Sequence, residues 1–258
     1  MSLWIIAACL ASGALIGFLG GVLGIGGGLI AIPALVLLMD MPQQLAQGTA
    51  LIMVLPTIIM AVRKYNQKVP IDPRVAAAGA LGAVAFTWLG ARLALGIASS
   101  TLRVSFAIFL FFVAVFYVYR MVRPPRPLHA NEVPRRAAPA LTPRRSAALG
   151  MLCGTFGGFF GVGGAVLCVP ILTAGFRLSQ TAAQALALTM VIPGSTIALI
   201  TYSWAGQANG WVGIPLALGS LAFVPVGVRL AYRMPDRHLR GCFAAMLFVT
   251  VGLLIYQA

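Results

Sequence analysis

The chain has 258 residues, of which 60% are hydrophobic and only 9% are charged. A soluble domain averages about 25% charged residues, so this chain has too few charges to cover a water-facing surface. Its 18 Lys and Arg against 4 Asp and Glu give a net charge of +14. The composition excludes a soluble enzyme, a disordered tail and a secreted disulfide scaffold. It predicts an all-α integral membrane protein.

The basic residues form short clusters between apolar runs, without interleaved aromatic residues. This pattern favours contact with the anionic surface of a lipid bilayer, and no nucleic-acid partner is expected. The four cysteines lie inside apolar runs without metal-ligand spacing. They are interpreted as small buried hydrophobes, so neither a metal nor a cofactor is expected.

The first apolar run covers residues 3–39 and is followed by runs at 45–62, 75–98 and 102–121. A helix of about 36 residues would be about 54 Å long, far beyond the roughly 30 Å of bilayer hydrocarbon. A glycine cluster at residues 24–28 interrupts the long run at mid-length. We therefore expect a helix that is broken or re-entrant there. Because no basic lead or cleavage site accompanies this run, we expect it to be retained rather than removed as a signal peptide.

Residues 122–145 are rich in Arg and Pro and predict a solvated linker. Four more apolar runs follow at 146–175, 182–204, 211–231 and 239–257, and the first of them is again long and broken by glycines at 161–164. The predicted organisation is one transmembrane repeat over 1–121, the linker over 122–145, and a second transmembrane repeat over 146–258.

The second half matches the first at an offset of 137 residues, without a gap. About a third of positions 13–121 are identical to 150–258, which indicates an internal duplication. The matched pairs include Gly17 with Gly154, Gln47 with Gln184, Pro56 with Pro193, Tyr65 with Tyr202 and Arg92 with Arg229. Apolar composition alone would not keep these residue types in register.

The basic residues decide between two topologies. If each long run crosses the membrane once, the two sides carry 11 and 7 Lys and Arg. If each long run instead enters and leaves on one side, the counts become 16 and 2, which fits the positive-inside rule far better. Each half then crosses three times, so the fold is predicted to be two inverted repeats of about four helical segments each. Both termini would lie outside and the linker in the cytoplasm.

The broken segments predict an anion site. A half-helix that starts after the glycines points unpaired N–H groups at the membrane centre. The predicted substrate-binding residues are Gly26, Gly27, Gly28, Gln47, Thr49, Gly163, Gly164, Gln184 and Thr189. The alternative for the glutamines and hydroxyls, including Ser195 and Thr196, is hydrogen bonding between helices.

Other matched residues are expected to serve structural roles or to act away from the binding site. Gly17, Gly20, Gly154 and Gly157 are expected to serve helix packing, and Tyr65 and Tyr202 to anchor span ends at the interface. Arg92 and Arg229 either snorkel to the headgroups or act as gate residues that attract anions. All four acidic residues fall in predicted loops, which disfavours a carboxylate-coupled carrier, a cation substrate and a membrane enzyme.

The doubled glycine pattern that ends at Pro33 and Pro170, with the two glutamines and the matched segments 90–94 and 227–231, resembles the sulfite exporter TauE/SafE family of membrane permeases. The resemblance implies transport of sulfite or a sulfur-containing organic anion such as sulfoacetate, usually outward across the bacterial inner membrane. Two further hypotheses are an anion importer or channel-like uniporter, and a non-transporting scaffold. The oligomeric state stays open between a monomer and a homodimer.

Overall fold

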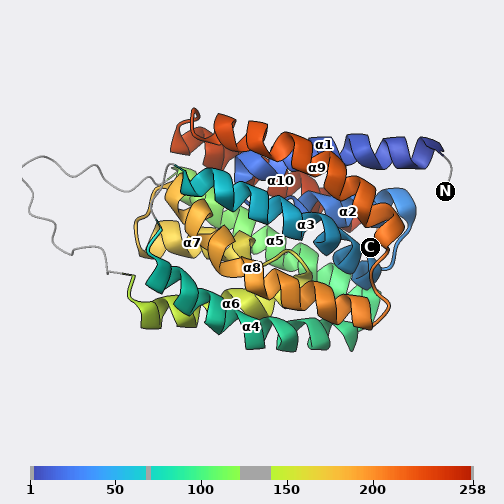
Figure 1. Ribbon diagram of the computed structural model, residues 1–258, viewed down its shortest axis with the longest axis horizontal. Helices are drawn as coiled ribbons and strands as arrows, with labels where there is room; N and C mark the ends of the chain where they lie inside the picture. Colours follow the sequence, from blue (N-terminus) through green and yellow to red (C-terminus); the bar gives the residue numbers. More distant parts are fainter. Residues whose placement is uncertain (1–2, 68–70, 123–140, 257–258) are drawn as a thin grey trace, which may run out of the picture.

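The computed structural model describes residues 3–67, 71–122 and 141–256, which form ten helices and no strand within these ranges (Figure 1). The first repeat holds α1 (Leu3–Leu23), α2 (Gly28–Met39), α3 (Gln43–Asn66), α4 (Pro73–Leu95) and α5 (Ser99–Val122). The second holds α6 (Pro143–Phe160), α7 (Ala165–Gly175), α8 (Gln180–Trp204), α9 (Gly210–Ala231) and α10 (Asp236–Tyr256). The predicted linker overlaps the last residue of α5 and the first turn of α6, and its residues 123–140 lie outside the described ranges.

The predicted duplication reappears in the helix boundaries. The helices α7, α8, α9 and α10 begin 137 residues after α2, α3, α4 and α5, since 165, 180, 210 and 236 minus 137 give 28, 43, 73 and 99. Each repeat therefore has five helices, because each long apolar run forms two. The breaks fall at residues 24–27 and 161–164, as the glycine clusters predict.

The two breaks also share one backbone conformation. Gly24, Gly26 and Gly27 have φ of 65°, 72° and 81°, and their partners Gly161, Gly163 and Gly164 have 67°, 73° and 76°. These left-handed values are strained for any residue with a Cβ atom. The repeated glycines are thus required by the turn itself, and we call residues 24–27 the first turn and 161–164 the second turn.

The repeats are interlocked rather than separate. Helix α1 packs along α9, and α6 packs along α4, while α3 packs against α8 and α5 against α10. The cross-repeat pairs approach closely at glycines: a Cβ atom on Gly17 would overlap the backbone of Ser220, and one on Gly154 would lie 2.6 Å from the Ala83 carbonyl oxygen. The packing role predicted for these two glycines fits these contacts.

Gly20 and Gly157 serve the turns instead. A Cβ atom on Gly20 would lie 2.6 Å from the backbone nitrogen of Gly27, and one on Gly157 would lie 2.6 Å from that of Gly164. Each glycine therefore lets its turn fold back onto the helix that precedes it. This local role is distinct from the contact between helices that the sequence predicts for them.

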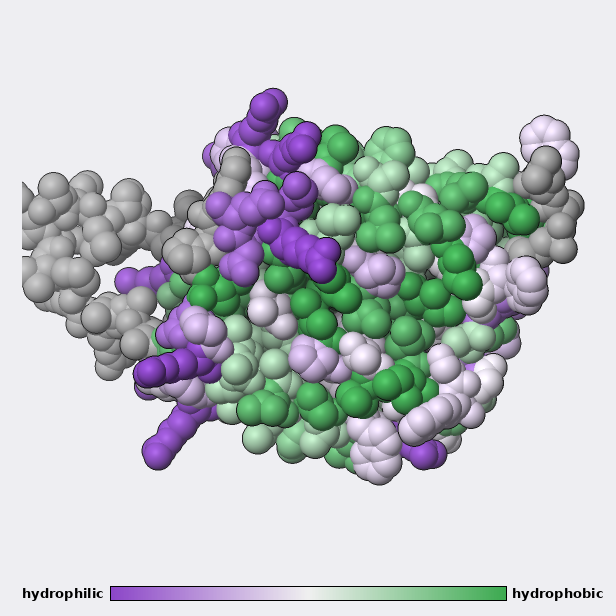
Figure 2. Space-filling model, in the orientation of Figure 1, coloured by the Kyte–Doolittle hydropathy of each residue, from purple (hydrophilic) through white to green (hydrophobic). Residues whose placement is uncertain are grey.

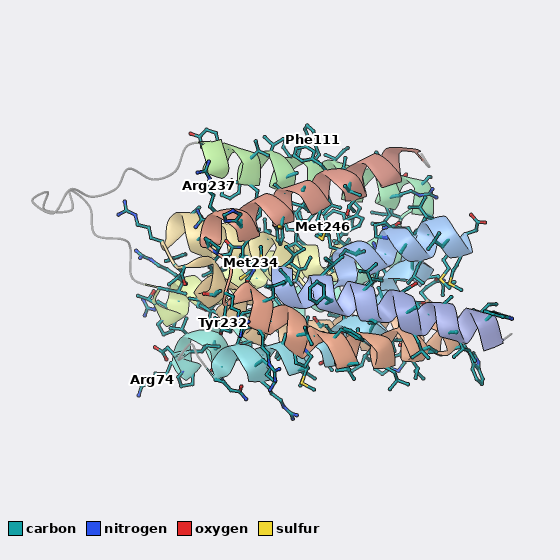
Figure 3. All side chains as sticks on the ribbon, turned by 90° about the horizontal axis from the view of Figure 1, so that it is seen from above. Arg74, Phe111, Tyr232, Met234, Arg237 and Met246 are labelled. Atoms are coloured by element: carbon teal, nitrogen blue, oxygen red, sulfur yellow. The ribbon has the colours of Figure 1, made fainter. Side chains whose placement is uncertain are left out.

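The surface is apolar around its middle and basic at one end. Within the described residues, six helices are long and apolar enough to cross a membrane, namely α1, α3, α4, α5, α8 and α9. Large side chains such as Leu81 and Phe112 are exposed on the outside. Figure 2 shows hydrophilic residues gathered at the end where α5 stops and α6 starts. Arg74 and Arg237 lie at this end (Figure 3), whereas α1 starts and α10 stops at the other (Figure 1).

The cysteines differ from one another in exposure. Cys9, Cys153 and Cys168 are buried, as predicted, but Cys242 is exposed. Cys242 lies on an outward-facing apolar groove between α1, α2 and α10. The prediction that all four cysteines are buried is therefore wrong for Cys242, because a membrane protein also places apolar residues on its lipid-facing surface.

Candidate functional site

The two glycine-rich turns meet in the interior. A Cβ atom on Gly28, the first residue of α2, would lie 3.6 Å from Cα of Val162 in the second turn. Val54 and Ile58 of α3 lie between the turns, because both side chains approach Gly26 and Gly163. The two glycine clusters, far apart in the sequence, therefore lie together in the structure.

The half-helices that leave these turns begin without side-chain caps. Glycines occupy the N-cap positions of α2 and α7, and neither start receives a side-chain hydrogen bond. Among the other helices, α4, α8 and α9 are capped by Asp72, Ser179 and Asn209, whereas α3 and α6 also lack a side-chain cap but do not begin at these turns. The first N–H groups of a helix carry a partial positive charge that favours an anion. Two such helix starts in the interior thus make an environment suited to negative charge.

Gln184 of the second repeat clamps the first turn. Its side chain is 1% exposed, and its Nε2 donates to the carbonyl oxygen of Leu23 at 2.7 Å. Its Oε1 lies 3.0 Å from the hydroxyl of Tyr65, which donates to it and to the Gly21 carbonyl oxygen at 3.1 Å. A Cβ atom on Gly24 would collide with this glutamine, so the amide lies directly against the turn.

Gln47 of the first repeat occupies the equivalent place at the second turn. Its Oε1 accepts from the Tyr202 hydroxyl at 2.7 Å, and that hydroxyl also donates to the Gly158 carbonyl oxygen at 3.1 Å. Its Nε2, however, is buried and has no hydrogen-bond partner among the described residues. The two glutamines are therefore related by the repeat, but only Gln184 has both ends of its amide satisfied.

The tyrosines contradict their predicted role. Tyr65 and Tyr202 are 0% exposed and hydrogen-bond the glutamines of the opposite repeat, so they are not interfacial anchors. Tyr232, at the end of α9, adds a further bond to the Tyr65 carbonyl oxygen at 2.9 Å (Figure 3). Both tyrosines lie at the ends of apolar runs, where interfacial anchors are usual. The sequence did carry a signal for their actual role, because a Tyr and a Gln recur together at the repeat offset.

The remaining predicted binding residues are divided between the turns, a helix interior and a loop contact. Gly26, Gly27, Gly163 and Gly164 form the turns, and Gly28 starts α2 beside them. Thr189 donates to the Ala185 carbonyl oxygen of its own helix at 2.8 Å. Thr49 accepts from the backbone N–H of Asn209 at 2.9 Å, in the connection between α8 and α9. The structure thus brings the glycines and Gln47 together with Gln184 and places Thr49 beside a loop.

Arg92 and Arg229 are exposed near the last turns of α4 and α9. The Arg92 guanidinium lies 5.7 Å from the ring centroid of Trp88. Neither arginine lines the turns, so a gate role for them, which stays a prediction, would act at the ends of the bundle rather than on a bound anion. In the described ranges the buried polar side chains, besides the tyrosines, are Gln, Ser and Thr, and none of them is charged.

Comparison with known proteins gives the family of the chain. The model of the sulfite exporter TauE/SafE family matches residues 9–254, nearly the whole chain. The chain belongs to the sulfite exporter TauE/SafE family. No solved structure matches it significantly.

Several curated relatives of this TauE/SafE chain are named as probable membrane transporter proteins. The one from Haemophilus influenzae is 28% identical over 274 residues, which is 95% of this chain and 96% of the relative. Those from Methanocaldococcus jannaschii (MJ0441) and Bacillus subtilis (YunE) are 26% and 22% identical, covering 92% and 95% of this chain and 90% and 95% of the relatives. Membership of a transporter family is consistent with a protein that is not an enzyme.

Proposed function

We propose that the protein is a permease that exports sulfite, or a small organosulfur anion such as sulfoacetate, across the bacterial inner membrane. The family supports membrane transport. The observation that carries the anion is the pair of uncapped helix starts, α2 and α7, side by side in an interior whose described buried polar residues are all uncharged. The anion is held near the membrane midplane, between the two turns.

The chemistry of the interior supports an anion over a cation. Backbone N–H groups at a helix start donate hydrogen bonds and attract negative charge. A cation carrier would need carboxylates, but Asp40, Asp72 and Asp236 all lie at helix ends. A membrane potential that is negative inside drives an anion outward by about 2.3 kcal/mol per charge per 100 mV. Export therefore needs no coupling residue.

The topology belongs to the proposal. Two inverted repeats place both termini outside and residues 122–145 in the cytoplasm, because the positive-inside rule assigns the basic end to the cytoplasm. Exposed Arg63, Arg74, Arg144, Arg177 and Arg233 all flank helix ends on the predicted cytoplasmic side. The start of α1 and the end of α10 both lie at the opposite end of the bundle, which supports the same orientation (Figure 1).

The test is anion-dependent stabilisation followed by flux. Purified protein in detergent is melted with sulfite, thiosulfate, sulfate, sulfoacetate, taurine and chloride, and the anions that stabilise it are followed in proteoliposomes. We expect selective stabilisation and flux for one sulfur anion. Failure of every sulfur anion contradicts the proposal.

Two alternatives are separated in the same vesicles. An importer or channel-like uniporter of this fold would respond to imposed potentials of both signs, whereas an exporter moves the anion preferentially from the side of the basic residues. A non-transporting scaffold predicts that Gln47→Ala with Gln184→Ala changes stability or assembly while no flux exists to be lost. Flux by the wild type that is weakened in this pair contradicts the scaffold.

A further inference from the structure

The surroundings of the two turns differ although the turns themselves match. In α3, the hydroxyl of Thr57 bonds the Met53 carbonyl oxygen at 2.6 Å and the Ser220 hydroxyl at 2.8 Å. Ile58 fills the space beside the first turn, where a Cβ atom on Gly26 would lie 2.6 Å from its Cγ1. The equivalent positions in α8 are Gly194 and Ser195, which are much smaller.

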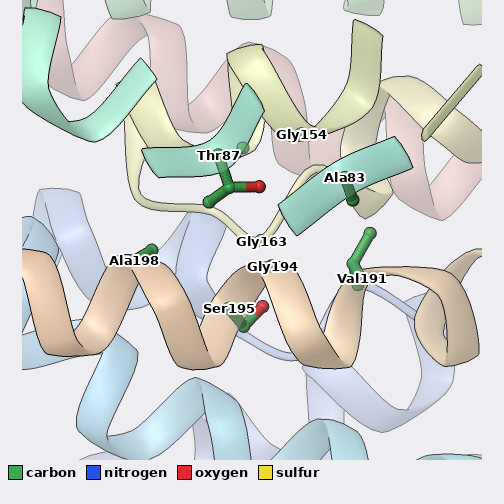
Figure 4. Close-up of a pocket in the computed structure, with 9 residues that line it drawn as sticks. Ala83, Thr87, Gly154, Gly163, Val191, Gly194, Ser195 and Ala198 are labelled. Atoms are coloured by element: carbon green, nitrogen blue, oxygen red, sulfur yellow. The ribbon is translucent and has the colours of Figure 1, made fainter. Parts of the chain in front are cut away.

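Beside the second turn, where these two residues of α8 are small, there is a pocket. The pocket lies between α4, the second turn and α8, with Thr87, Gly163, Gly194 and Ser195 among its lining residues (Figure 4). In this structure the space is too narrow for a water molecule. The structure is therefore closed around this pocket, and a ligand enters only if α4 and α8 move apart.

Ser195 directs an unsatisfied hydroxyl into this pocket. The residue is 1% exposed, and its Oγ has no hydrogen-bond partner among the described residues. Thr189, Thr196 and Thr201, on the same helix, instead donate to the carbonyl oxygens four residues earlier at 2.8, 3.0 and 2.8 Å. A Cβ atom on Gly163 would lie 2.9 Å from Ser195 Oγ, so this hydroxyl faces the turn rather than its own helix.

A second unsatisfied donor lies against the same turn. The Nε2 of Gln47 has no partner, and a Cβ atom on Gly161 would lie 2.7 Å from its Cβ. Gln43, one helical turn earlier on the same face of α3, is 0% exposed and lacks a partner at both Nε2 and Oε1. Buried polar atoms without partners are rare and costly, so two of them against one turn, from Ser195 and Gln47, point to a ligand.

We infer that the anion binds off-axis, that is, at the second turn rather than midway between the two turns, where Ser195 Oγ and Gln47 Nε2 donate to it beside the start of α7. This inference rests on the proposed function and deepens it by assigning the two turns different roles. The first turn, whose neighbouring Gln184 and Thr57 are fully bonded, is structural. The small pocket selects a compact oxyanion of the size of sulfite over an anion with a longer organic chain.

Ser195→Ala and Ser220→Ala form a matched test. Both remove one buried hydroxyl, but Ser220 bonds Thr57 and the Ala217 carbonyl oxygen, whereas Ser195 has no partner. We expect Ser195→Ala to leave the melting temperature without ligand unchanged or slightly raised. It should raise the dissociation constant for sulfite about tenfold or more. Ser220→Ala should lower that melting temperature and leave the dissociation constant within about twofold of the wild type.

The outcomes are distinguishable. Wild-type protein that binds no sulfur anion overturns the proposed function and this inference together. Wild-type binding of sulfite that Ser195→Ala leaves unchanged overturns only the off-axis site, and so does equal weakening by both variants. In the expected case, Ser195→Ile, which installs the residue found at the equivalent position 58, abolishes sulfite binding because it also fills the pocket.

Discussion

The first and second turns are two copies of one motif that can be compared within a single chain. Their glycines have the same φ angles to within a few degrees, and each receives a glutamine and a tyrosine from the same repeat positions. Yet Gln184 bonds Leu23 through its Nε2, whereas the Nε2 of Gln47 is unpaired. The backbone conformation of the turn therefore does not fix the hydrogen bonds of the side chains around it. A duplicated motif can keep its backbone while its neighbouring side chains change their bonding.

The largest loss of stability is expected for alanine at Gly164, and the comparison is with alanine at the equivalent Gly27. Both have positive φ, and an alanine there costs about 1–2 kcal/mol from the backbone alone. A Cβ atom on Gly164 would overlap the Cys153 carbonyl oxygen, but one on Gly27 would first meet Cγ2 of Ile16 at 2.9 Å. A side chain yields more easily than backbone, so we expect Gly164→Ala to cost about 4 kcal/mol or more and Gly27→Ala about 2 kcal/mol.

The measurement is the yield of monodisperse protein and its melting temperature in detergent. Gly175→Ala is the control, because a Cβ atom at Gly175 would meet no atom within 4 Å and its φ is not positive. Equal losses at Gly27 and Gly164 would mean that the two turns are equally confined, contrary to the packing described above.

The glutamines give the next largest effect. Gln184→Ala removes two hydrogen bonds between the repeats and leaves the Leu23 carbonyl oxygen unpaired, so it should destabilise the protein by about 2 kcal/mol or more. Gln47→Ala removes only the bond from Tyr202 and should cost about 1 kcal/mol. Melting curves without ligand compare the two variants. A larger loss for Gln47→Ala would show that its Nε2 has an interaction that the closed structure lacks.

Tyr65→Phe and Tyr202→Phe test the same bonds from the other side at a smaller scale. Each removes one hydroxyl that joins a glutamine to the α1 or α6 backbone, at an expected cost of about 1 kcal/mol. Because the two environments match, the two losses should be equal within a few tenths of a kcal/mol in paired melting curves. A neutral result at both positions would mean that these buried hydroxyls do not stabilise the contact between the repeats.

The helical repeats and their breaks follow from the sequence because glycine and proline impose backbone conformations that need no distant partner. The offset of 137 residues and the break at residues 24–27 could be predicted for that reason. The burial of Tyr65 could not, because hydropathy locates the end of an apolar run but not the helix face that turns inward. The pocket at Ser195 depends on α4, which packs there only because the repeats interlock.

The smallest expected effect on stability concerns Gly194, the glycine that opens the pocket. A Cβ atom there would lie 2.7 Å from Oγ1 of Thr87 and 3.6 Å from Cβ of Ala83, so only the end of one side chain must move. Alanine is favoured over glycine inside a helix by about 1 kcal/mol, which offsets that contact. We expect Gly194→Ala to melt within a few degrees of the wild type while its stabilisation by sulfite falls, because the added methyl group occupies the pocket.

Gly154→Ala is the contrasting variant on the facing helix. Its Cβ atom would lie 2.6 Å from the Ala83 carbonyl oxygen, so backbone rather than a side chain must move. This variant should therefore be less stable than the wild type. Unimpaired sulfite stabilisation in a well-folded Gly194→Ala protein would argue that the space beside Ser195 is a packing defect of the second repeat. A selective loss would instead tie the divergence of the two turns to the binding of the anion.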